Sequence, residues 1–311
     1  MSDFHHISVL LEECLEGLNI KPNGIYVDGT LGGAGHSSRI AARLTTVKLI
    51  GIDRDPIALA AAGERLKPFG DRVELVHSNF CRMAEVLQQL QIFGVDGILL
   101  DLGVSSPQLD DGQRGFSYMV DAPLDMRMNN QDSLDAGTVV NTWSQEELRR
   151  ILYTYGEERY APQIAAAICR RREEKTIETT LELVDIIRGA MPPAALREKQ
   201  HPAKRSFQAI RIAVNDELAS VERAMEAAIP LLNPGGRLAV ITFHSLEDRI
   251  VKNAMAQAAK GCTCPPSFPV CVCGKKPQVK LISRKPVLAS EEELERNPRS
   301  RSAKLRICEK V

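Results

Sequence analysis

Residues 25–66 read IYVDGTLGGAGHSSRIAARLTTVKLIGIDRDPIALAAAGERL, and this stretch decides the fold. It begins with a short strand rich in β-branched and aromatic residues, which runs into a glycine-rich turn and then a helix. The order repeats with a strand over residues 48–52, Asp53 at its end, and a helix that begins near Pro56, a residue suited to a first helical turn. Strands and helices that alternate at this spacing predict a parallel α/β sheet.

Two further strands are predicted over residues 73–80 and 94–106. The second of these contains the continuous apolar run Ile98–Leu100, which is typical of a strand that is buried on both faces of a sheet. After residue 102 the pattern changes to a loop-rich segment, and only helical signals follow that segment.

The helical part of the chain is marked by two capping boxes, in which Ser144 pairs with Glu147 and Thr179 pairs with Glu182. One long helix is expected over about residues 205–229, because apolar residues step by three or four throughout it. This stretch also contains no glycine or proline, so nothing in it predicts a break.

The α/β pattern returns after a turn at residues 233–236, where a strand, a helix and two final strands follow. We therefore predict a discontinuous, Rossmann-like α/β domain formed by residues 1–110 and 216–311. An all-helical domain over residues 111–215 is inserted into it, and we expect this insertion to recognise the substrate.

The composition limits the class of protein. The 311 residues include 40 Lys+Arg and 40 Asp+Glu, which gives a net charge of +0 and excludes a large uniform attraction to nucleic acid. Residues 197–211 and 262–290 each carry five cations against at most one acid, and they are either phosphate-contacting patches or solvated faces. No apolar run reaches about 18 residues and the N-terminus lacks a basic n-region, so we expect a cytoplasmic protein without a membrane span.

The turn Asp28–His36 reads DGTLGGAGH and lies between a strand and a helix. Glycines there let the backbone approach a ligand, and Asp53 lies where an acid meets ribose hydroxyls in Rossmann-like sites. The dehydrogenase pattern G-x-G-x-x-G fails in every register, and a Walker A lysine is missing. The pattern D-G-T-x-G-x-x-G-H is instead similar to the first motif of S-adenosylmethionine-dependent methyltransferases. The alternative is that residues 28–36 form an ordinary tight turn between strand and helix, and that Asp53 ends the next strand by chance.

The fourth strand ends in DLGVSSPQLD over residues 101–110. Because ligands lie at the carboxyl ends of strands in open α/β sheets, we expect this loop to face the reacting group. Ser106-Pro107 matches part of the S/D/N-P-P-Y/F motif of amino-methyltransferases, whereas Gln108 and Leu109 replace its second proline and its aromatic residue. On this motif alone, an ordinary serine–proline turn is the better interpretation.

Longer segments follow one another along the chain, namely HISVLLEE, DGTLGGAGHS, IDRDP, DGILLDLGVSSPQLDDGQRGFSY, PLDMRM, YGEERYA, HPAKRSFQAIRIAVNDEL, PGGRLAVITFHSLEDRIVK and NPRSRSAKLR. Together they resemble the bacterial ribosomal RNA small subunit methyltransferase H family (RsmH, also called MraW). The resemblance implies a class I methyltransferase sheet with a helical insertion. It also implies methyl transfer from S-adenosylmethionine to N4 of a cytidine in the decoding region of 16S rRNA, within the small ribosomal subunit.

The resemblance also implies which residues bind the cofactor. The positions that match the family's cofactor contacts are Ala34, Gly35, His36, Asp53, Phe80, Asp101 and Gln108. Ala34 departs from the pattern, because glycine is expected at this position in many relatives. A backbone N–H contact survives that change if φ is negative.

Catalysis in this interpretation needs acceptors that hold the amine, and we assign this role to Asp101 and Ser106. A cofactor contact without a chemical role is the alternative for Asp101. A Ser-His hydrolase built on His244 and Ser245 is disfavoured, because adjacent residues on a strand end point apart and no G-x-S-x-G turn exists. His244 is then a substrate-side or structural residue.

Aromatic residues are candidates to receive a target base that has left its stack. Those near the proposed cleft are Phe116, Tyr118 and Phe243, and ordinary packing is the alternative for each.

The eight cysteines fall into two groups. Those that are scattered are expected to be ordinary buried thiols, namely Cys14, Cys81, Cys169 and Cys308. Those that are clustered offer four thiolates to a structural zinc ion, namely Cys262, Cys264, Cys271 and Cys273. Free or redox-active thiols are the alternative.

Two other functions stay open at this point. One is amino-methyl transfer to another RNA or to DNA. The other is a cofactor-dependent, RNA-binding factor for ribosome assembly in which methylation is secondary. The sequence leaves the oligomeric state undetermined.

Overall fold

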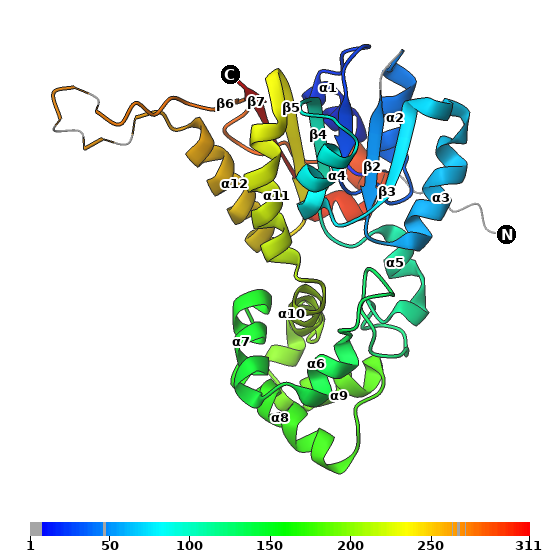
Figure 1. Cartoon of the computed structure of the whole chain (residues 1–311). Coiled ribbons are helices and arrows are strands. Elements are labelled where there is room, and N and C mark those ends of the chain that lie inside the picture. The colour runs from blue at the N-terminus through cyan, green and yellow to red at the C-terminus, as the bar shows by residue number, and fades with distance from the viewer. Residues whose placement is uncertain (1–7, 46–47, 263, 266–267, 271) are drawn as a thin grey trace. The chain divides into compact units, whose positions relative to one another are not determined.

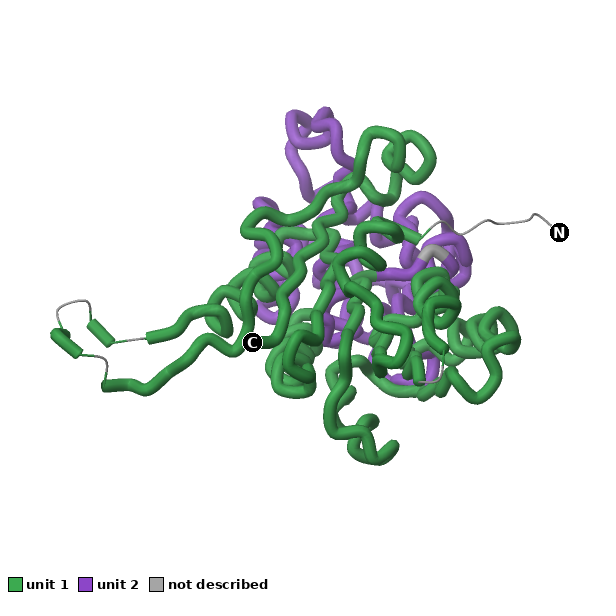
Figure 2. Tube along the Cα trace, turned by 90° about the horizontal axis from the view of Figure 1, so that it is seen from above, with its two compact units in different colours: residues 1–103, 218–311 green, residues 104–217 purple. Residues whose placement is uncertain are grey.

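The computed structural model describes residues 8–45, 48–262, 264–265, 268–270 and 272–311, and for Ser106 only the backbone. The chain forms two compact units, shown in Figure 2. One unit combines Met1–Gly103 with Leu218–Val311, and the other is Val104–Glu217. The boundaries expected from the sequence lay at residues 110/111 and 215/216, so the second unit begins seven residues earlier and ends two residues later.

A mixed, seven-stranded sheet forms the centre of the first unit, with the strand order β3-β2-β1-β4-β5-β7-β6 (Figure 1). Strands β1 to β5 run parallel, whereas β7 is antiparallel to both of its neighbours. This arrangement confirms the predicted α/β class. The strands are β1 (Tyr26–Asp28), β2 (Leu49–Asp53), β3 (Val73–His77), β4 (Val95–Asp101), β5 (Leu232–Thr242), β6 (Val279–Leu281) and β7 (Lys304–Lys310).

Helices cover both faces of this sheet. One face packs against α4, α11 and α12, and the other packs against α1 and α2, whereas α3 contacts the glycine turn. Their bounds are α1 (Leu11–Leu18), α2 (Gly35–Arg43), α3 (Pro56–Leu66), α4 (Met83–Gln89), α11 (Glu217–Leu231), α12 (Ser245–Ala259) and α13 (Glu291–Arg296).

Strand β4 lies at the centre of the sheet, and its apolar run is buried on both sides. Ile98 and Leu100 belong to the core on one face, whereas Leu99 belongs to the core on the other. All three are at most 1% exposed, which confirms the strand predicted from the continuous apolar run. Burial of both faces fixes the position of the strand's carboxyl end, where Asp101 lies.

The second unit is helical. Its helices are α5 (Ser106–Asp110), α6 (Ala136–Thr142), α7 (Gln145–Gly156), α8 (Ala161–Glu174), α9 (Thr180–Ala190) and α10 (Lys204–Asn215). Both predicted capping boxes are confirmed, with Ser144 and Glu147 at the start of α7 and Thr179 and Glu182 at the start of α9. Among the described residues, no helix has both the length and the apolar character needed to cross a bilayer.

The single long helix expected over residues 205–229 is wrong. The chain forms two helices there, because Asp216 adopts a left-handed conformation (φ 48°) and ends α10. Asn215 stabilises this break, since its amide group donates to the Met126 carbonyl and accepts from the Met128 N–H. Asn and Asp tolerate the left-handed region better than other non-glycine residues, so the Asn-Asp pair was the available signal.

Candidate active site

Three carboxylates lie at the carboxyl ends of neighbouring parallel strands. Asp28 ends β1, Asp53 ends β2 and Asp101 ends β4. The loop after β1 is tied to β4 by the Asp101 N–H, which donates to Thr30 Oγ1 at 2.6 Å. This edge of the sheet is where open α/β folds bind ligands.

The glycines of the turn after β1 serve different purposes. A side chain on Gly29 would collide with Leu100, and one on Gly35 would collide with Ser8, so both positions allow close packing. Gly32 instead has a positive φ of 48°, and a would-be Cβ there would meet only the Thr30 carbonyl oxygen, at 3.9 Å, so the reason for this glycine is conformational. The turn therefore packs closely at Gly29 and Gly35, while Gly32 supplies a left-handed backbone conformation.

Ala34 immediately precedes α2 and has φ 57° and ψ 30°, which lies in the left-handed region. The backbone N–H contact to the cofactor was expected to survive the change from glycine to alanine if φ were negative, and φ is positive instead. The residue is fully buried and its N–H donates to the Leu31 carbonyl at 2.8 Å. An alanine held in this conformation carries a strain of roughly 1 kcal/mol that a glycine would not carry.

Asp53 is held by the backbone on both of its oxygens. The Gly32 N–H donates to Oδ2 at 2.7 Å, and the Asp55 N–H donates to Oδ1 at 2.8 Å. Burial raises the pKa of Asp53, while these backbone hydrogen bonds act in the opposite direction. Each carboxylate oxygen has a further lone pair, so Asp53 keeps acceptor capacity for hydroxyl groups while it fixes the glycine turn.

Asp101 is the most perturbed carboxyl group of this edge. Burial, followed by the nearby carboxylates of Asp28 and Glu247, raises its pKa to about 8. Its Oδ1 is buried and has no hydrogen-bond partner among the described residues, while the side chain as a whole keeps 24% of its surface exposed. A buried acceptor without a partner, beside other carboxylates, suits a ligand that brings a positive charge and an N–H donor.

Asp28 and Glu247 shape this environment, and both were missed as site residues. Asp28 accepts from the Ser37 hydroxyl at 2.7 Å, and burial raises its pKa to about 6. Glu247 is buried and accepts from the Phe243 N–H at 2.9 Å. The available signal for Asp28 was its place at the strand end that opens the D-G-T motif, whereas no sequence pattern pointed to Glu247.

The structure brings most of the predicted cofactor residues together in the first unit. His36 is buried, with Nε2 3.0 Å from the Val9 carbonyl oxygen and Nδ1 3.9 Å from Asp101 Oδ2. Phe80 follows β3 and packs beside Gly29. The other residues of this group are Ala34, Gly35, Asp53 and Asp101.

Ser106 and Gln108 lie in the second unit, on α5. Ser105 and Gln108 form a capping box, in which the Gln108 Oε1 accepts from the Ser105 N–H at 3.0 Å. The Gln108 side chain therefore caps the N-terminus of α5. The side chain of Ser106 is outside the described part, so its predicted catalytic role stays a prediction.

The aromatic candidates differ in their surroundings. Phe116 is buried in the core of the helical unit, and Phe243 is partly buried against the sheet. Tyr118 stacks on His201 with ring centroids 4.6 Å apart. His244 caps α12 and lies 3.1 Å from Glu247 Oε1, which favours the structural interpretation of this residue.

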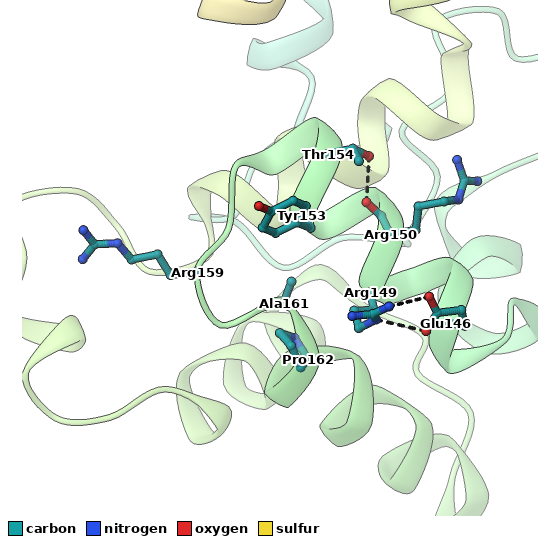
Figure 3. Close-up of a pocket in the computed structure, with 8 residues that line it drawn as sticks. All are labelled: Glu146, Arg149, Arg150, Tyr153, Thr154, Arg159, Ala161 and Pro162. Atoms are coloured by element: carbon teal, nitrogen blue, oxygen red, sulfur yellow. Dashed lines mark hydrogen bonds and ion pairs between the residues drawn. The ribbon is translucent and has the colours of Figure 1, made fainter.

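A hollow on the helical unit carries an arginine cluster that the sequence analysis missed. Its volume is about 390 Å³, and α7 and the start of α8 line it (Figure 3). The Tyr153 side chain is 69% exposed there, and Figure 3 shows Arg150 and Arg159 on opposite sides of it in this view. Arg149 is paired with Glu146 through two hydrogen bonds of 2.6 and 3.0 Å.

The guanidinium groups of Arg150 and Arg159 make no hydrogen bond or ion pair with any described residue. By contrast, several cations of the two predicted basic patches are already paired. Arg211 binds Glu217 at 2.8 Å, and Lys280 lies 2.7 Å from Glu309. The count of charges in a run therefore overestimates the number of cations that are available to a phosphate.

The sheet and its site define the class of protein. A parallel sheet with a reversed final strand, a glycine turn after β1 and acids at the next strand ends form a class I S-adenosylmethionine-dependent methyltransferase fold. Among solved structures, an rRNA methylase from Streptococcus thermophilus aligns with 98% of this chain and 99% of its own, at 11% identity and a TM-score of 0.45.

Comparison with known families and proteins gives the more specific assignment. The chain belongs to the MraW methylase family, whose model matches residues 3–311. It is 58% identical over 309 residues to a Brevibacillus brevis protein, with 99% of this chain and 98% of the relative covered. A Geobacter sp. (strain M21) protein is 55% identical over 312 residues and covers 100% of both chains. Both relatives are named ribosomal RNA small subunit methyltransferase H.

Proposed function

We propose that this protein transfers a methyl group from S-adenosylmethionine to the exocyclic N4 of a cytidine in the decoding region of 16S rRNA. The names of the relatives support an rRNA of the small subunit as substrate. One observation supports an amine as the acceptor group, namely the buried Asp101 Oδ1 that has no partner among the described residues. We further propose that the protein acts in the cytoplasm, on rRNA within the small ribosomal subunit.

The cofactor would lie along the carboxyl edge of the sheet, because the residues there fit it. Asp53 offers acceptors for ribose hydroxyls from a position that two backbone hydrogen bonds fix. Phe80 lies beside the glycine turn and offers an apolar surface for the adenine. The clustered carboxylates of Asp28 and Asp101 favour a cation, which matches a sulfonium group. When bound, the cofactor supplies an electrophilic methyl group.

Asp101 would orient the amine and receive its proton. The N4 lone pair is delocalised into the cytosine ring, so the nitrogen is a poor nucleophile unless an acceptor polarises its N–H bonds and raises the electron density on the nitrogen. Asp101 would hold the amine through its N–H groups while the cofactor supplies the methyl group, and a carboxylate oxygen of Asp101 would receive the proton that the nitrogen loses on methylation. The raised pKa of about 8 makes this carboxylate a stronger base than an ordinary aspartate.

The helical unit would recognise the RNA. The hollow lined by α7 and α8 supports this role, because it combines an exposed aromatic ring with Arg150 and Arg159, whose guanidinium groups make no hydrogen bond or ion pair with a described residue. Arginines contact phosphates, and aromatic rings stack on unpaired bases in single-stranded RNA. Such a surface gives a chain of net charge +0 a local means of binding nucleic acid.

The test is transfer of a tritiated methyl group from S-adenosylmethionine to three substrates, namely free 16S rRNA, reconstituted small subunits and duplex DNA. Label in the assembled subunit alone supports the proposal and shows that the shape of the substrate matters. Label in DNA or another RNA would favour the alternative amino-methyltransferase. A methylation-dead variant that still restores ribosome assembly would favour an assembly factor.

A further inference from the structure

The cysteines outside the active site differ sharply in their surroundings. Cys14 and Cys308 are fully buried, and burial raises the pKa of Cys308 to about 12, so both stay inert thiols. Cys81 and Cys169 are only partly buried, which corrects the expectation that all four scattered thiols are buried. The clustered cysteines instead lie in the segment between α12 and β6, which Figure 1 shows as an extended loop.

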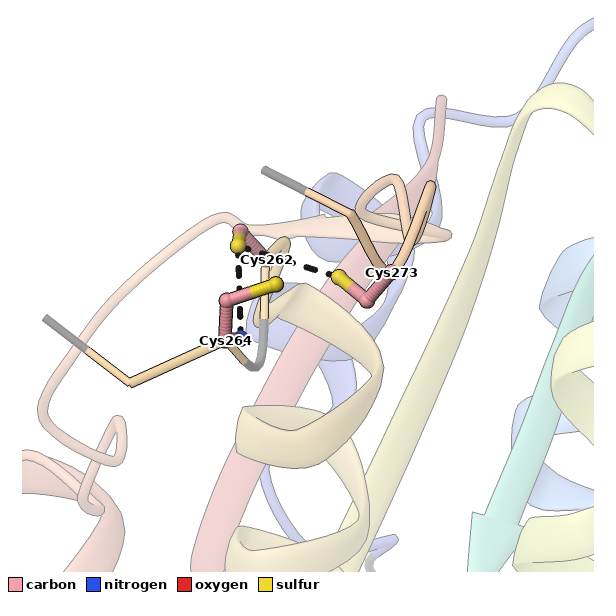
Figure 4. A group of neighbouring side chains, drawn as sticks. All are labelled: Cys262, Cys264 and Cys273. Atoms are coloured by element: carbon pink, nitrogen blue, oxygen red, sulfur yellow. Dashed lines mark hydrogen bonds between the residues drawn. The ribbon is translucent and has the colours of Figure 1, made fainter. Parts of the chain in front are cut away.

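Three thiols of this loop converge. Cys262, Cys264 and Cys273 place their Sγ atoms within 4.8 Å of one another, and Figure 4 shows the three side chains grouped together. The Sγ atoms of Cys262 and Cys273 are 3.7 Å apart. Cys271, the fourth cysteine of the predicted set, lies outside the described residues.

These distances match a tetrahedral metal site. Zinc–thiolate bonds of about 2.3 Å place neighbouring sulfur atoms of a tetrahedron about 3.8 Å apart. The 3.7 Å between Cys262 and Cys273 agrees with this edge and is far longer than a disulfide bond of about 2.05 Å. Backbone N–H groups already point at the sulfur atoms, because Cys264 N lies 3.4 Å from Cys262 Sγ and Val272 N lies 3.4 Å from Cys264 Sγ. Such donors stabilise thiolates in metal sites.

The loop has little else to hold it together. Its apolar side chains face solvent, with Phe268 51%, Val270 70% and Val272 74% exposed. At its base, the Gln278 N–H donates to the Ala258 carbonyl at 2.8 Å. Between the end of α12 at Ala259 and the start of β6 at Val279, the described residues form no helix or strand. A small segment without a core needs a metal or a covalent link to keep one conformation.

The donor set selects the metal. Residues 262–290 contain no Asp or Glu, so no carboxylate of this segment competes with sulfur and the hard cations Mg²⁺ and Ca²⁺ are disfavoured. Lys260, Lys275 and Lys276 flank the cluster and offset the negative charge of several thiolates. We infer that Cys262, Cys264 and Cys273 bind a structural zinc ion that folds the loop between α12 and β6. The inference is independent of the proposed methyl transfer.

The test uses the full-length, untagged protein, purified under reducing conditions without added metal. Elemental analysis is expected to find about one zinc per chain. Titration with an organomercurial reagent is expected to release this zinc in proportion to the thiols that react. After exchange into Co²⁺, the protein should show thiolate-to-cobalt charge-transfer absorption and the d–d bands of a tetrahedral site.

Single substitutions locate the site. Cys262→Ser, Cys264→Ser and Cys273→Ser should each lose most of the zinc, whereas the matched controls Cys81→Ser and Cys169→Ser should retain it. Chelation should also make the loop sensitive to trypsin at Lys275 or Lys276, while S-adenosylmethionine binding persists as a check that the first unit stays folded.

Three results would overturn the inference. The first is a wild-type protein that, when reduced, binds neither zinc nor Co²⁺ through thiolates. The second is zinc retention in all three cluster variants. The third is a disulfide between Cys262 and Cys273 whose reduction creates no metal site, which would identify a redox pair instead.

Discussion

Replacement of Asp101 by asparagine separates a chemical role of this residue from a binding role. The substitution keeps the shape of the side chain, removes its ability to ionise and leaves it without a site for the departing proton. If Asp101 receives the proton of the amine, turnover at saturating S-adenosylmethionine should fall by about 10²–10⁴-fold, the usual contribution of a general base. Cofactor affinity should also fall, because the sulfonium loses a nearby carboxylate, but by less than turnover, because Asp28, Asp53 and the glycine turn are intact.

The structure also predicts that this variant is more stable than the parent protein. At pH 7, a carboxyl group with a pKa of about 8 keeps its proton in the folded chain, whereas it ionises in the unfolded chain. This difference costs at most roughly 4 kcal/mol of folding free energy. Because 24% of the Asp101 side chain is exposed, solvent screens part of the cost, and we expect asparagine to stabilise the protein by about 1–2 kcal/mol.

The pH dependence has a definite sign. The folded-state pKa of Asp101 is raised, so its destabilising effect grows as pH rises from about 4 to about 8 and is absent in acid. Turnover should increase over the upper part of this range, as the carboxylate forms, and the midpoint should fall when a cationic cofactor is bound.

Methyl transfer, cofactor binding and thermal unfolding of the parent protein and Asp101→Asn test these expectations together. Asp53→Asn is the matched control, a carboxylate at a neighbouring strand end, and it should weaken cofactor binding more than turnover at saturation. The reasoning about Asp101 is refuted if Asp101→Asn retains turnover within about threefold and keeps the pH profile of the parent protein.

Substitutions at three other places test separate parts of the structure. Ala34→Gly should stabilise the protein by about 0.5–1 kcal/mol in thermal unfolding, because the position has φ 57°, whereas Gly32→Ala should destabilise it by a similar amount. Asn215→Ala should cost about 2–4 kcal/mol in denaturant unfolding, because it leaves buried backbone groups without partners. Arg150→Ala should weaken RNA binding and lower the salt slope by about one, whereas Arg149→Ala, which removes a cation already paired with Glu146, should change the slope less. Equal slopes in these two variants would contradict an RNA-binding role for the hollow.

The buried strand β4 and the helix capping boxes were predicted correctly, because each depends on a pattern within a few consecutive residues. The apolar run Ile98–Leu100 predicted a buried strand because only a strand covered on both faces uses three consecutive apolar residues in this way. The capping box at the start of α7 could be predicted because its two residues, Ser144 and Glu147, are only three positions apart. The break at Asp216 was missed because apolar periodicity continues through it, and its cause is the contact of Asn215 with the distant Met126 and Met128.

The site was predictable only in part, for a related reason. Asp53 and Asp101 stand at strand ends, so the position of each follows from the strand itself. Glu247 influences Asp101 although their positions are far apart in the sequence, and only the folded sheet brings the two together. The availability of Arg150 likewise depends on which neighbours pair with which, because Arg149 beside it is neutralised by Glu146. The Glu146–Arg149 pair is local, with the two residues three positions apart in α7, so its spacing was visible in the sequence although a charge count does not contain it.

The most direct test of the central claim is the chemical identity of the methylated nucleoside. Small subunits labelled with this protein and tritiated S-adenosylmethionine would be digested to nucleosides, and the label would be separated by chromatography with mass spectrometry. The account predicts that the label is in N4-methylcytidine and disappears with Asp101→Asn. Label on a ring carbon, on a ribose hydroxyl or on a base other than cytosine would contradict it.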